Sequence, residues 1–581
     1  MPTSFRFIRA AGCSALLAAL LATTTLPASA QDMDGFTGSY LAARSADANA
    51  DFKALVEYGT RALADRPDNA GIMEGLLVAH IGLGQIDMAV PVARRLTELS
   101  PSNELGQLVL LGDAMGSEDW AGVDRILSGD FSVGGLMDPL IRAWAAIGEG
   151  KMSDALAIFD DLAQDEVAAQ VSAFQKAQAL AFVGDYEGAA EILSGETVPV
   201  TLNRAGVIAY AQILSQLERN QEAVALIDEQ LPETGDEEIM TLRAELDAGK
   251  PIDFDAIRSP KDGLSALFYN VGEALANEAS PSLVLIYARL SEHLNPDNVG
   301  ATLLTAAVFE NMGNNALAVE TYDQIADDSR AWPQAMMGKA NALRRMEQPE
   351  EAIAALSQVA DRFPELSTIH VALGDAYRYE EDWAASQAAY DDAIALYTED
   401  HPAQWAVYFA RGIVQERQDL WTEAEADFRK ALELQPGQPS VLNYLGYSYV
   451  EKGENLDEAL DMIRDAVEAR PNEGYIVDSL GWVYYRLGRY DEAVVEMEKA
   501  VALMPVDPVV NDHLGDVYWA VGRVREAEFQ WHRALSFVTE DSDLDEVKPD
   551  RIRRKLEVGL DTVLEEEGAE PLLTRERAAA N

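Results

Sequence analysis

One pattern, present twice in succession between Val477 and Ala534, constrains the fold more than any other feature of the chain. The first copy contains, in order, Val477, Leu480, Gly481, Tyr484, Ala493, Met497, Ala500 and Pro505. The second contains Asn511, Leu514, Gly515, Tyr518, Ala527, Trp531 and Ala534. The interval from Gly481 to Gly515 equals the interval from Ala493 to Ala527. Unrelated amphipathic helices do not keep a fixed period, so the pattern predicts stacked helix-turn-helix units.

The spacing inside each copy has a mechanical meaning. Four residues of the first copy fall at i, i+3, i+4 and i+7 on one helix face: Val477, Leu480, Gly481 and Tyr484. Small residues at Gly481 and Ala493 allow the two helices of a unit to approach closely. The larger residue that follows, Met497 in one copy and Trp531 in the other, is expected to fill the space beside them.

This pattern resembles the tetratricopeptide repeat (TPR), whose period is about 34 residues, and degenerate copies extend it along the chain. Two series keep the same period: Ala155, Ala189 and Ala223, and then Gly272, Ala306, Ala340 and Gly374. The resemblance implies an all-α fold, a TPR solenoid that forms a right-handed superhelix of helix-turn-helix repeats. The period lapses between the two series, so we expect the solenoid to consist of two blocks.

The boundaries follow from where the pattern begins, lapses and ends. Gly249, Pro251, Pro260 and Gly263 punctuate the lapse, which we interpret as a break or hinge. The predicted segments are a signal peptide (1–30), a leader (31–39), an N-terminal block of degenerate repeats (40–232), the break (233–262), a C-terminal block (263–540), an acidic linker with a capping helix (541–568), and a disordered tail (569–581).

The first thirty residues are typical of a secretory signal peptide. Arg6 and Arg9 precede an apolar run from Ala10 to Leu21, and Ala28–Ala30 provides a small-residue cleavage site. We predict cleavage after Ala30, a periplasmic location and no transmembrane segment. The only cysteine, Cys13, lacks a preceding apolar run, so lipid attachment is not expected. The mature chain would then hold no cysteine, which excludes disulfides and cysteine-ligated zinc.

The charge balance limits the kinds of partner that the chain can bind. The chain has 99 acidic and 45 basic side chains, a formal net charge of −54, which opposes binding to nucleic acid. One interpretation is a basic partner, and the other is an adaptation for solubility. The acids are spread along the whole chain, which favours the second interpretation.

The search for catalytic chemistry is negative. The chain has no Gly-x-Ser-x-Gly elbow, no phosphate-binding glycine-rich loop with lysine and no His-Glu-x-x-His motif. Its six histidines are spread along the chain without ligand spacing. Asp541, Asp543 and Asp545 are similar to the start of a calcium loop, but Glu546 replaces the turn glycine and Ile552 the bidentate glutamate. We therefore predict that the chain is not an enzyme and has no cofactor and no metal site. The acidic run is expected to be a solvated linker.

The helix face left over after core packing supplies the candidate partner-binding groove. In the last three repeats this face carries Asn443, Tyr447, Tyr475, Asp478, Trp482, Tyr485, Asp512, Asp516 and Trp519. Aromatic rings interleaved with carboxylates and an amide suit an extended or helical peptide that bears basic or amide groups. We expect the acids to be exposed. For Tyr447, Trp482 and Trp519, exposure and packing between repeats stay open as alternatives.

One dense basic cluster follows the last repeat. It consists of Lys548, Arg551, Arg553, Arg554 and Lys555. In so acidic a chain these side chains are expected to pair with the solenoid's own carboxylates, and an acidic partner is the alternative.

Three segments resemble one bacterial envelope family more closely. Residues Leu442–Tyr447, Asp478–Val483 and His513–Trp519 are similar to a TPR adaptor that binds a carboxyl-terminal processing protease and delivers cell-wall hydrolases to it. The resemblance implies a non-enzymatic scaffold with those protein partners. That adaptor is a lipoprotein, whereas this signal ends in Ala-Ser-Ala, so membrane tethering does not carry over. The alternative is a structural component of outer-membrane or surface-polymer assembly machinery.

Overall fold

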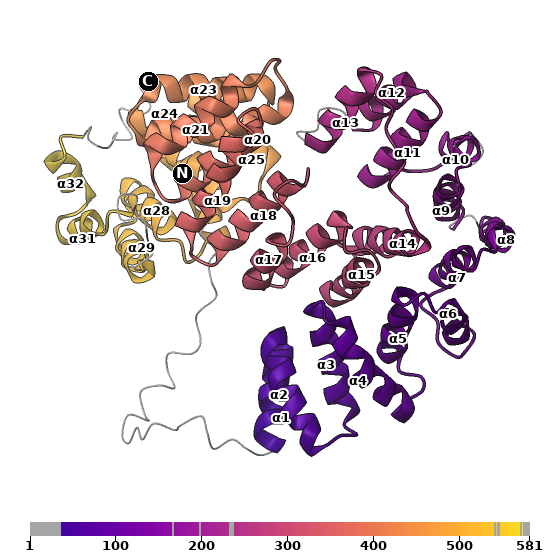
Figure 1. The fold of residues 1–581 in the computed structure, drawn as a ribbon. Coiled ribbons are helices and arrows are strands. Elements are labelled where there is room, and N and C mark those ends of the chain that lie inside the picture. Colours follow the sequence, from indigo (N-terminus) through magenta and orange to yellow (C-terminus); the bar gives the residue numbers. More distant parts are fainter. Residues whose placement is uncertain are drawn as a thin grey trace. The chain divides into compact units, whose positions relative to one another are not determined.

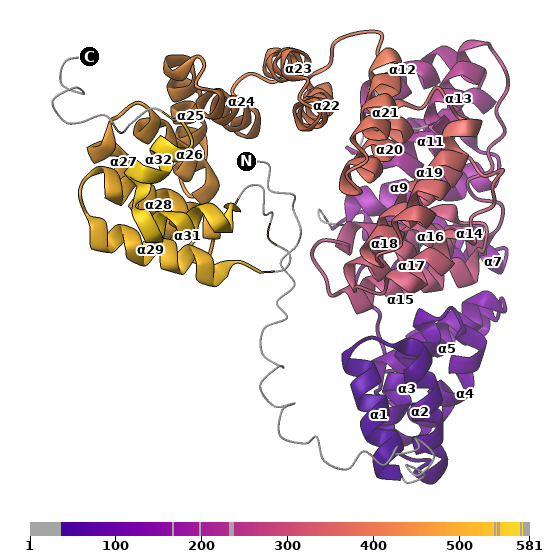
Figure 2. The same ribbon diagram turned by 90° about the vertical axis from the view of Figure 1, so that its left-hand side faces the viewer.

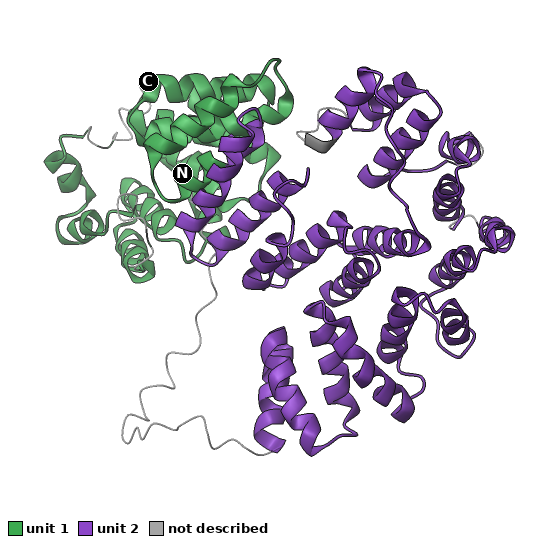
Figure 3. Cartoon of the chain, viewed as in Figure 1, with its two compact units in different colours: residues 1–11, 373–581 green, residues 12–372 purple. Residues whose placement is uncertain are grey.

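The computed structural model describes residues 36–165, 168–196, 199–231, 237–539 and 547–569, with residues 542 and 572. All regular structure within these ranges is helical (Figure 1), which confirms the predicted all-α solenoid. Contacts divide the chain into two compact units, one ending at Ala372 and the other beginning at Leu373 (Figure 3). The predicted signal peptide, the carboxylates of Asp541, Asp543 and Asp545, and most of the predicted tail lie outside the described residues.

The first unit is a series of paired helices. It contains α1 (Phe36–Ala48), α2 (Phe52–Asp65), α3 (Ala70–Gly82), α4 (Ile86–Leu99), α5 (Glu104–Gly116), α6 (Trp120–Leu127), α7 (Met137–Gly148), α8 (Met152–Leu162), α9 (Ala169–Phe182), α10 (Tyr186–Leu193), α11 (Arg204–Gln216), α12 (Asn220–Gln230), α13 (Glu237–Asp247), α14 (Pro260–Leu275), α15 (Pro281–Leu294), α16 (Val299–Asn311), α17 (Asn315–Tyr322), α18 (Trp332–Arg345) and α19 (Pro349–Arg362).

The second unit continues the pairing. Its helices are α21 (Trp383–Ala395), the short η1 (Pro402–Gln404), α22 (Trp405–Arg417), α23 (Trp421–Leu434), α24 (Pro439–Lys452), α25 (Leu456–Ala469), α26 (Gly474–Arg486), α27 (Tyr490–Leu503), α28 (Pro508–Ala520), α29 (Val524–Phe537), α31 (Pro549–Val558) and α32 (Leu560–Glu566). Helix α20 (Ser367–Tyr379) spans the boundary between the units.

The helix pairs are closed by turns that recur with the sequence period. Gly488 and Gly522 occupy the turns after α26 and α28, with φ of 72° and 81°. This left-handed conformation is strained for residues that carry a Cβ, so glycine is favoured there. Asp51, Asn69 and Asn103 start α2, α3 and α5, and each side chain accepts a hydrogen bond from the backbone N–H three residues on.

Close approach within each pair follows the predicted mechanism. A Cβ on Gly481 would lie 2.7 Å from Met497 Cγ, and a Cβ on Gly515 would lie 2.4 Å from Trp531 Cδ1. Met497 and Trp531 are both fully buried. The glycines therefore make room for the large side chain of the paired helix, which confirms the sequence interpretation.

The first unit also contains packing that sequence order does not suggest. Helices α14 and α15 pack against α3, α5, α7 and α9, the first helices of earlier pairs (Figure 1). A Cβ on Gly263 would lie 2.4 Å from Trp144, and one on Gly112 would lie 2.7 Å from Leu290. Arg289 Nε donates a hydrogen bond to the Gly82 carbonyl at 3.0 Å. The inner face of the early helices is therefore core.

The segment 233–262, which the sequence predicts to separate two blocks, lies within this unit. It contains α13, whose Leu242 and Leu246 are buried in one hydrophobic cluster with residues of α11 and α12. After α13, residues 250–258 run without helical structure along α11, and we call this segment the strap. Helix α14, which follows the segment, contacts α7 and α9, which precede it. Helices from both sides of the segment therefore pack on one another.

Candidate functional site

The nine predicted groove residues lie on three equivalent helices of the second unit. Asn443 and Tyr447 are on α24, Tyr475, Asp478, Trp482 and Tyr485 on α26, and Asp512, Asp516 and Trp519 on α28. Each of these helices is the first of its pair, and successive ones contact each other: α24 with α26, and α26 with α28. The sequence therefore grouped the residues correctly on one row of helices.

The expectation that the acids are exposed was wrong. Asp478 and Asp516 are 1% exposed and Asp512 is 9% exposed. The reason is that the face beside the core stripe also packs against the next first helix of the row. A carboxylate in that position is desolvated and needs a cation beside it. Each acid has a cation beside it: His513 for Asp478, and Lys555 for both Asp512 and Asp516.

Asp478 pairs with His513 of the next helix. His513 Nδ1 lies 2.9 Å from Asp478 Oδ2. Burial lowers the pKa of His513, but the charge and hydrogen bond of Asp478 outweigh it and raise this pKa to about 9. His513 is therefore an imidazolium at neutral pH. It also stacks on Trp482, with ring centroids 4.1 Å apart and planes 14° apart.

Helices α31 and α32 follow the last repeat, and we call them the capping helices. Helix α31 supplies the cation that binds Asp512 and Asp516. Lys555 of α31 is 1% exposed, and its Nζ lies 2.8 Å from both carboxylate oxygens of Asp512 and 2.6 Å from Asp516 Oδ1. Trp531 Nε1 donates to the same Asp516 oxygen at 2.9 Å. Trp519 Nε1 donates to Asp561 of α32 at 2.8 Å. Figure 2 shows α31 beside α28 and α29.

Two members of the basic cluster pair with the solenoid's own carboxylates, as the sequence predicts. Lys555 binds the solenoid acids Asp512 and Asp516, and Arg551 contacts Asp516 at 3.6 Å. The other pairs are local to the capping helices: Arg551 with Glu567, Arg553 with Asp550, and Arg554 with Glu557 and Glu566. The cluster thus attaches the capping helices to the last first helix of the row, α28. The sequence analysis had treated the capping helix and the basic cluster as separate features.

What remains on the surface is an aromatic strip. Tyr447, Tyr475, Trp482 and Trp519 are partly exposed, and we call these four residues the aromatic strip. Tyr485, in contrast, is 8% exposed and stacks on Trp482 with ring centroids 4.7 Å apart. The same burial raises the pKa of Tyr485 well above its ordinary value.

The rim of the strip is polar. Trp482 Nε1 donates to Glu451 Oε1 at 2.6 Å, and Arg486 lies 3.8 Å from the same oxygen. Asn443 is 2% exposed, and among the described residues its Oδ1 has no hydrogen-bond partner. Such a surface combines aromatic rings with one carboxylate, which is suited to recognising a protein segment.

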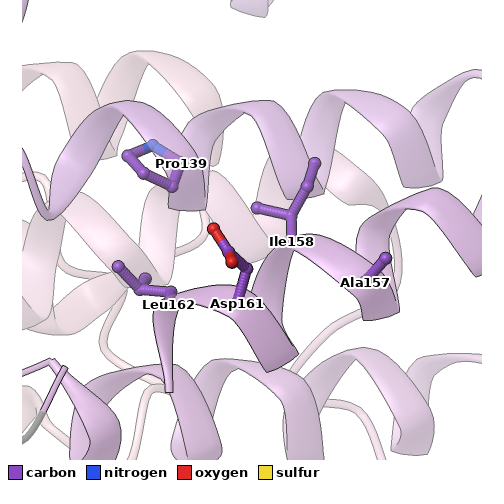
Figure 4. Close-up of a pocket in the computed structure, with 5 residues that line it drawn as sticks. All are labelled: Pro139, Ala157, Ile158, Asp161 and Leu162. Atoms are coloured by element: carbon purple, nitrogen blue, oxygen red, sulfur yellow. The ribbon is translucent and has the colours of Figure 1, made fainter. Parts of the chain in front are cut away.

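The described residues show no arrangement typical of a catalytic centre. No group of three or more histidine, cysteine, aspartate or glutamate side chains among them is placed to hold a metal ion. A small pocket of about 250 Å³ lies between α7 and α8, lined by Pro139, Ala157, Ile158, Asp161 and Leu162 (Figure 4). Asp161 is the one ionisable residue of that lining, so no second polar group converges on it. None of the helices in the described ranges is long and apolar enough to cross a membrane.

Comparison with known proteins identifies the repeat. A family model described as tetratricopeptide repeat matches residues 337–378 and 371–439, and a second model with the same description matches residues 477–505. The described residues fold as a tetratricopeptide-repeat solenoid. TPR proteins of this kind bind protein partners and are generally not enzymes.

Two curated relatives share part of this TPR solenoid. A TPR repeat-containing protein of Pseudomonas aeruginosa is 25% identical over 189 residues, 32% of this chain and 30% of that protein. A lipoprotein NlpI homolog of Haemophilus influenzae is 36% identical over 85 residues, 15% of this chain and 27% of that protein. The chain thus spans less than a third of the length of either relative.

Two solved structures illustrate the similarity at the level of the fold. The APC/C hetero-tetramer Cut9–Hcn1 aligns with 90% of this chain and 96% of that one, at 16% identity and a TM-score of 0.37. YrrB, described as a TPR protein with an unusual peptide-binding site, aligns with 32% of this chain and 94% of its own, at 18% identity and a TM-score of 0.28.

Proposed function

We propose that this TPR solenoid is a periplasmic scaffold whose aromatic strip binds a segment of a protein partner. The observation that carries the proposal is the strip itself. Its four rings lie on successive first helices; stacking on Tyr485 and His513 holds Trp482, and a hydrogen bond to Asp561 of α32 holds Trp519. Rings that are already fixed lose little conformational entropy on binding, and buried aromatic anchors dominate the energy of most interfaces.

The finer part of the proposal concerns the partner. We propose that the scaffold is an adaptor that delivers cell-wall enzymes to a carboxyl-terminal processing protease. The segments that resemble this adaptor family, such as Asp478–Val483 and His513–Trp519, include Trp482 and Trp519 of the aromatic strip. Export is supported by the signal-like sequence that ends at Ala30. The relative from Haemophilus influenzae is named as a lipoprotein, which also supports an envelope location.

Affinity capture from envelope fractions tests the proposal. The full-length chain is the bait, and the variant carries Trp482→Ala with Tyr447→Ala. Asp516 is unsuitable for the test because it is buried and holds Lys555. Loss of two anchor rings should weaken capture by about 30-fold or more, while helicity by circular dichroism stays unchanged. Phe529→Ala, at a ring that is 60% exposed on α29, is the matched control and should leave capture intact.

The identity of the captured proteins decides the finer part. A protease with cell-wall hydrolases supports the adaptor. Components of an outer-membrane or surface-polymer assembly machine would favour the alternative, a structural scaffold in that machine. Capture that is unchanged by the double substitution would refute the aromatic strip as the binding surface.

A further inference from the structure

The first unit contains a groove of about 630 Å³, and no residue of the aromatic strip lines it. Helices α9 and α11 form one side, α14 and α16 the other, and strap residues 255–258 also line it. Its volume is in the range of ligand sites in proteins. The lining is rich in carboxamides: Gln178, Gln212, Asn270, Asn295, Asn298 and Gln334. Carboxamides both donate and accept hydrogen bonds, as a peptide backbone does.

Helix α11 already binds extended backbone in this region. Gln216 Nε2 donates to the Ile252 carbonyl at 2.6 Å, and the Ile252 N–H donates to Ser215 Oγ at 2.9 Å. One turn earlier, Gln212 Oε1 accepts from the Asp255 N–H at 3.3 Å while its Nε2 donates to Asp255 Oδ1 at 2.7 Å. These side chains contact backbone atoms of the strap, so the helix holds an extended segment largely through groups that any sequence provides.

A glutamine and an apolar residue occupy the equivalent positions one repeat earlier, on α9. Gln178 precedes Gln212 by one repeat period, and Phe174 precedes Ile208 by the same interval. All four line the groove. Gln178 is 4% exposed, and its Oε1 has no hydrogen-bond partner among the described residues. A buried carboxamide oxygen without a partner is costly, and a backbone N–H is the group from which its repeat equivalent, Gln212, accepts.

The opposite side of the groove supplies apolar surface and negative charge. Leu303, Leu304 and Ala307 of α16 face it together with Ala266 of α14. The charged residues of the whole groove lining are Asp255, Asp262, Glu273 and Asp297, against Arg204 and Arg258. Arg258 is already paired with Asp255 at 3.0 Å. The excess of acids disfavours an acidic ligand, and the apolar patch favours a ligand with an aliphatic or aromatic side chain.

We propose that this groove is a second binding site, for an extended peptide segment of a protein partner that has no acidic residues and carries an apolar side chain. A backbone N–H of the segment donates to Gln178, as the Asp255 N–H donates to Gln212. Its apolar side chain packs between Phe174 and the leucines of α16. The inference goes beyond the proposed function, because the site lies in the other unit and does not use the aromatic strip.

A capped synthetic peptide tests the site directly. The probe is Pro-Ile-Asn-Phe-Asn-Ala-Ile-amide with a zwitterionic tetramethylrhodamine capping its N-terminus, which copies strap residues 251–257 with both aspartates changed to asparagine. Fluorescence anisotropy is measured with the full-length chain. We expect saturable binding that Gln178→Ala weakens about tenfold or more. Gln170→Ala, an exposed glutamine on the same helix, is the matched control and should bind like the wild type.

Two further variants make the outcomes decisive. Trp482→Ala should not change peptide binding, and hydrogen exchange should show protection of α9 on binding but none of α26. No binding to the wild type, or equal binding to Gln178→Ala, overturns the proposal. Binding that Gln212→Ala abolishes and Gln178→Ala preserves means that the peptide replaces the strap, which also overturns it. Binding that depends on Trp482 instead would overturn it by assigning the peptide to the aromatic strip, and would leave the proposed function standing.

Discussion

Replacing Lys555 by methionine removes the positive charge that lies between two buried carboxylates. The substitution keeps an unbranched apolar stem that is one atom shorter, so the packing of α31 changes little. Asp512 and Asp516 each lie within 2.8 Å of Lys555 Nζ, and both are at most 9% exposed. A further cation near the pair is Arg551, at 3.6 Å from Asp516.

The magnitude follows from these distances. The nearest oxygens of the two acids lie 2.8 and 2.6 Å from the same nitrogen, so the two carboxylates are close neighbours. At an effective dielectric constant of about 20, two unit charges roughly 5 Å apart repel by about 3 kcal/mol. Removing one partner from a buried ion pair typically costs about 3–5 kcal/mol. Arg551 offsets part of this, so we expect a cost of about 3 kcal/mol.

Native-state hydrogen exchange measures this cost where it arises. Opening of α31 and of the adjacent face of α28 should become about 100-fold more frequent in Lys555→Met at neutral pH. The effect should shrink at acidic pH, because burial raises the pKa of Asp512 and protonation relieves the unpaired charge. Adding Asp512→Asn and Asp516→Asn should restore most of the protection.

The control is Arg553→Met on the same helix. Its side chain is 61% exposed and pairs with Asp550 three residues away, so the change should stay within about 0.5 kcal/mol. Equal protection of α31 in Lys555→Met and in the wild type would refute the view that the buried ion pairs fasten the capping helices.

Two more predictions concern the same unit. The folded-state pKa of His513, about 9, lies above its unfolded value near 6.5, so its stabilising contribution is complete below about pH 6.5 and is lost as the pH rises through 9. Thermal unfolding followed by tryptophan fluorescence should show this loss, and His513→Gln should flatten it. Gly515→Ala should cost about 2–3 kcal/mol because the new methyl group meets the rigid Trp531 ring, whereas Gly481→Ala meets the flexible Met497 and should cost clearly less in urea titrations. Equal costs would contradict this packing argument.

The fold could be predicted from the sequence because its determinants are local and periodic. Gly481, Gly515 and their large partners Met497 and Trp531 each act within one pair of helices, and the fixed spacing repeats the same contact. Such features need no knowledge of distant parts of the chain. The grouping of the candidate residues on successive first helices followed from the same period.

The exposure of the candidate site could not be predicted in the same way. Whether Asp516 faces solvent depends on α31, which follows the last repeat and carries no repeat signature. The hydrophobic pattern of one helix cannot distinguish a face that lines a groove from a face that meets a neighbour, because both lie beside the core stripe. Lys555 could have indicated this burial, because a lysine on the apolar side of a capping helix needs buried acids beside it.

The strap and its groove were also beyond sequence reasoning. Gln178 and Gln212 share a repeat position, and the sequence alone could have shown that. Their function depends on where residues 250–258 return along α11, and a segment without helical periodicity gives no information about its destination.

The packing of α14 and α15 against the early helices has a consequence for folding during synthesis. During synthesis, Gly112 on α5 emerges long before Leu290 on α15, the side chain that covers it. Contacts so distant in sequence form slowly, because a long loop has to close first. A fragment that stops near residue 231 should therefore expose apolar surface and aggregate, whereas one that extends to residue 372 carries its own cover.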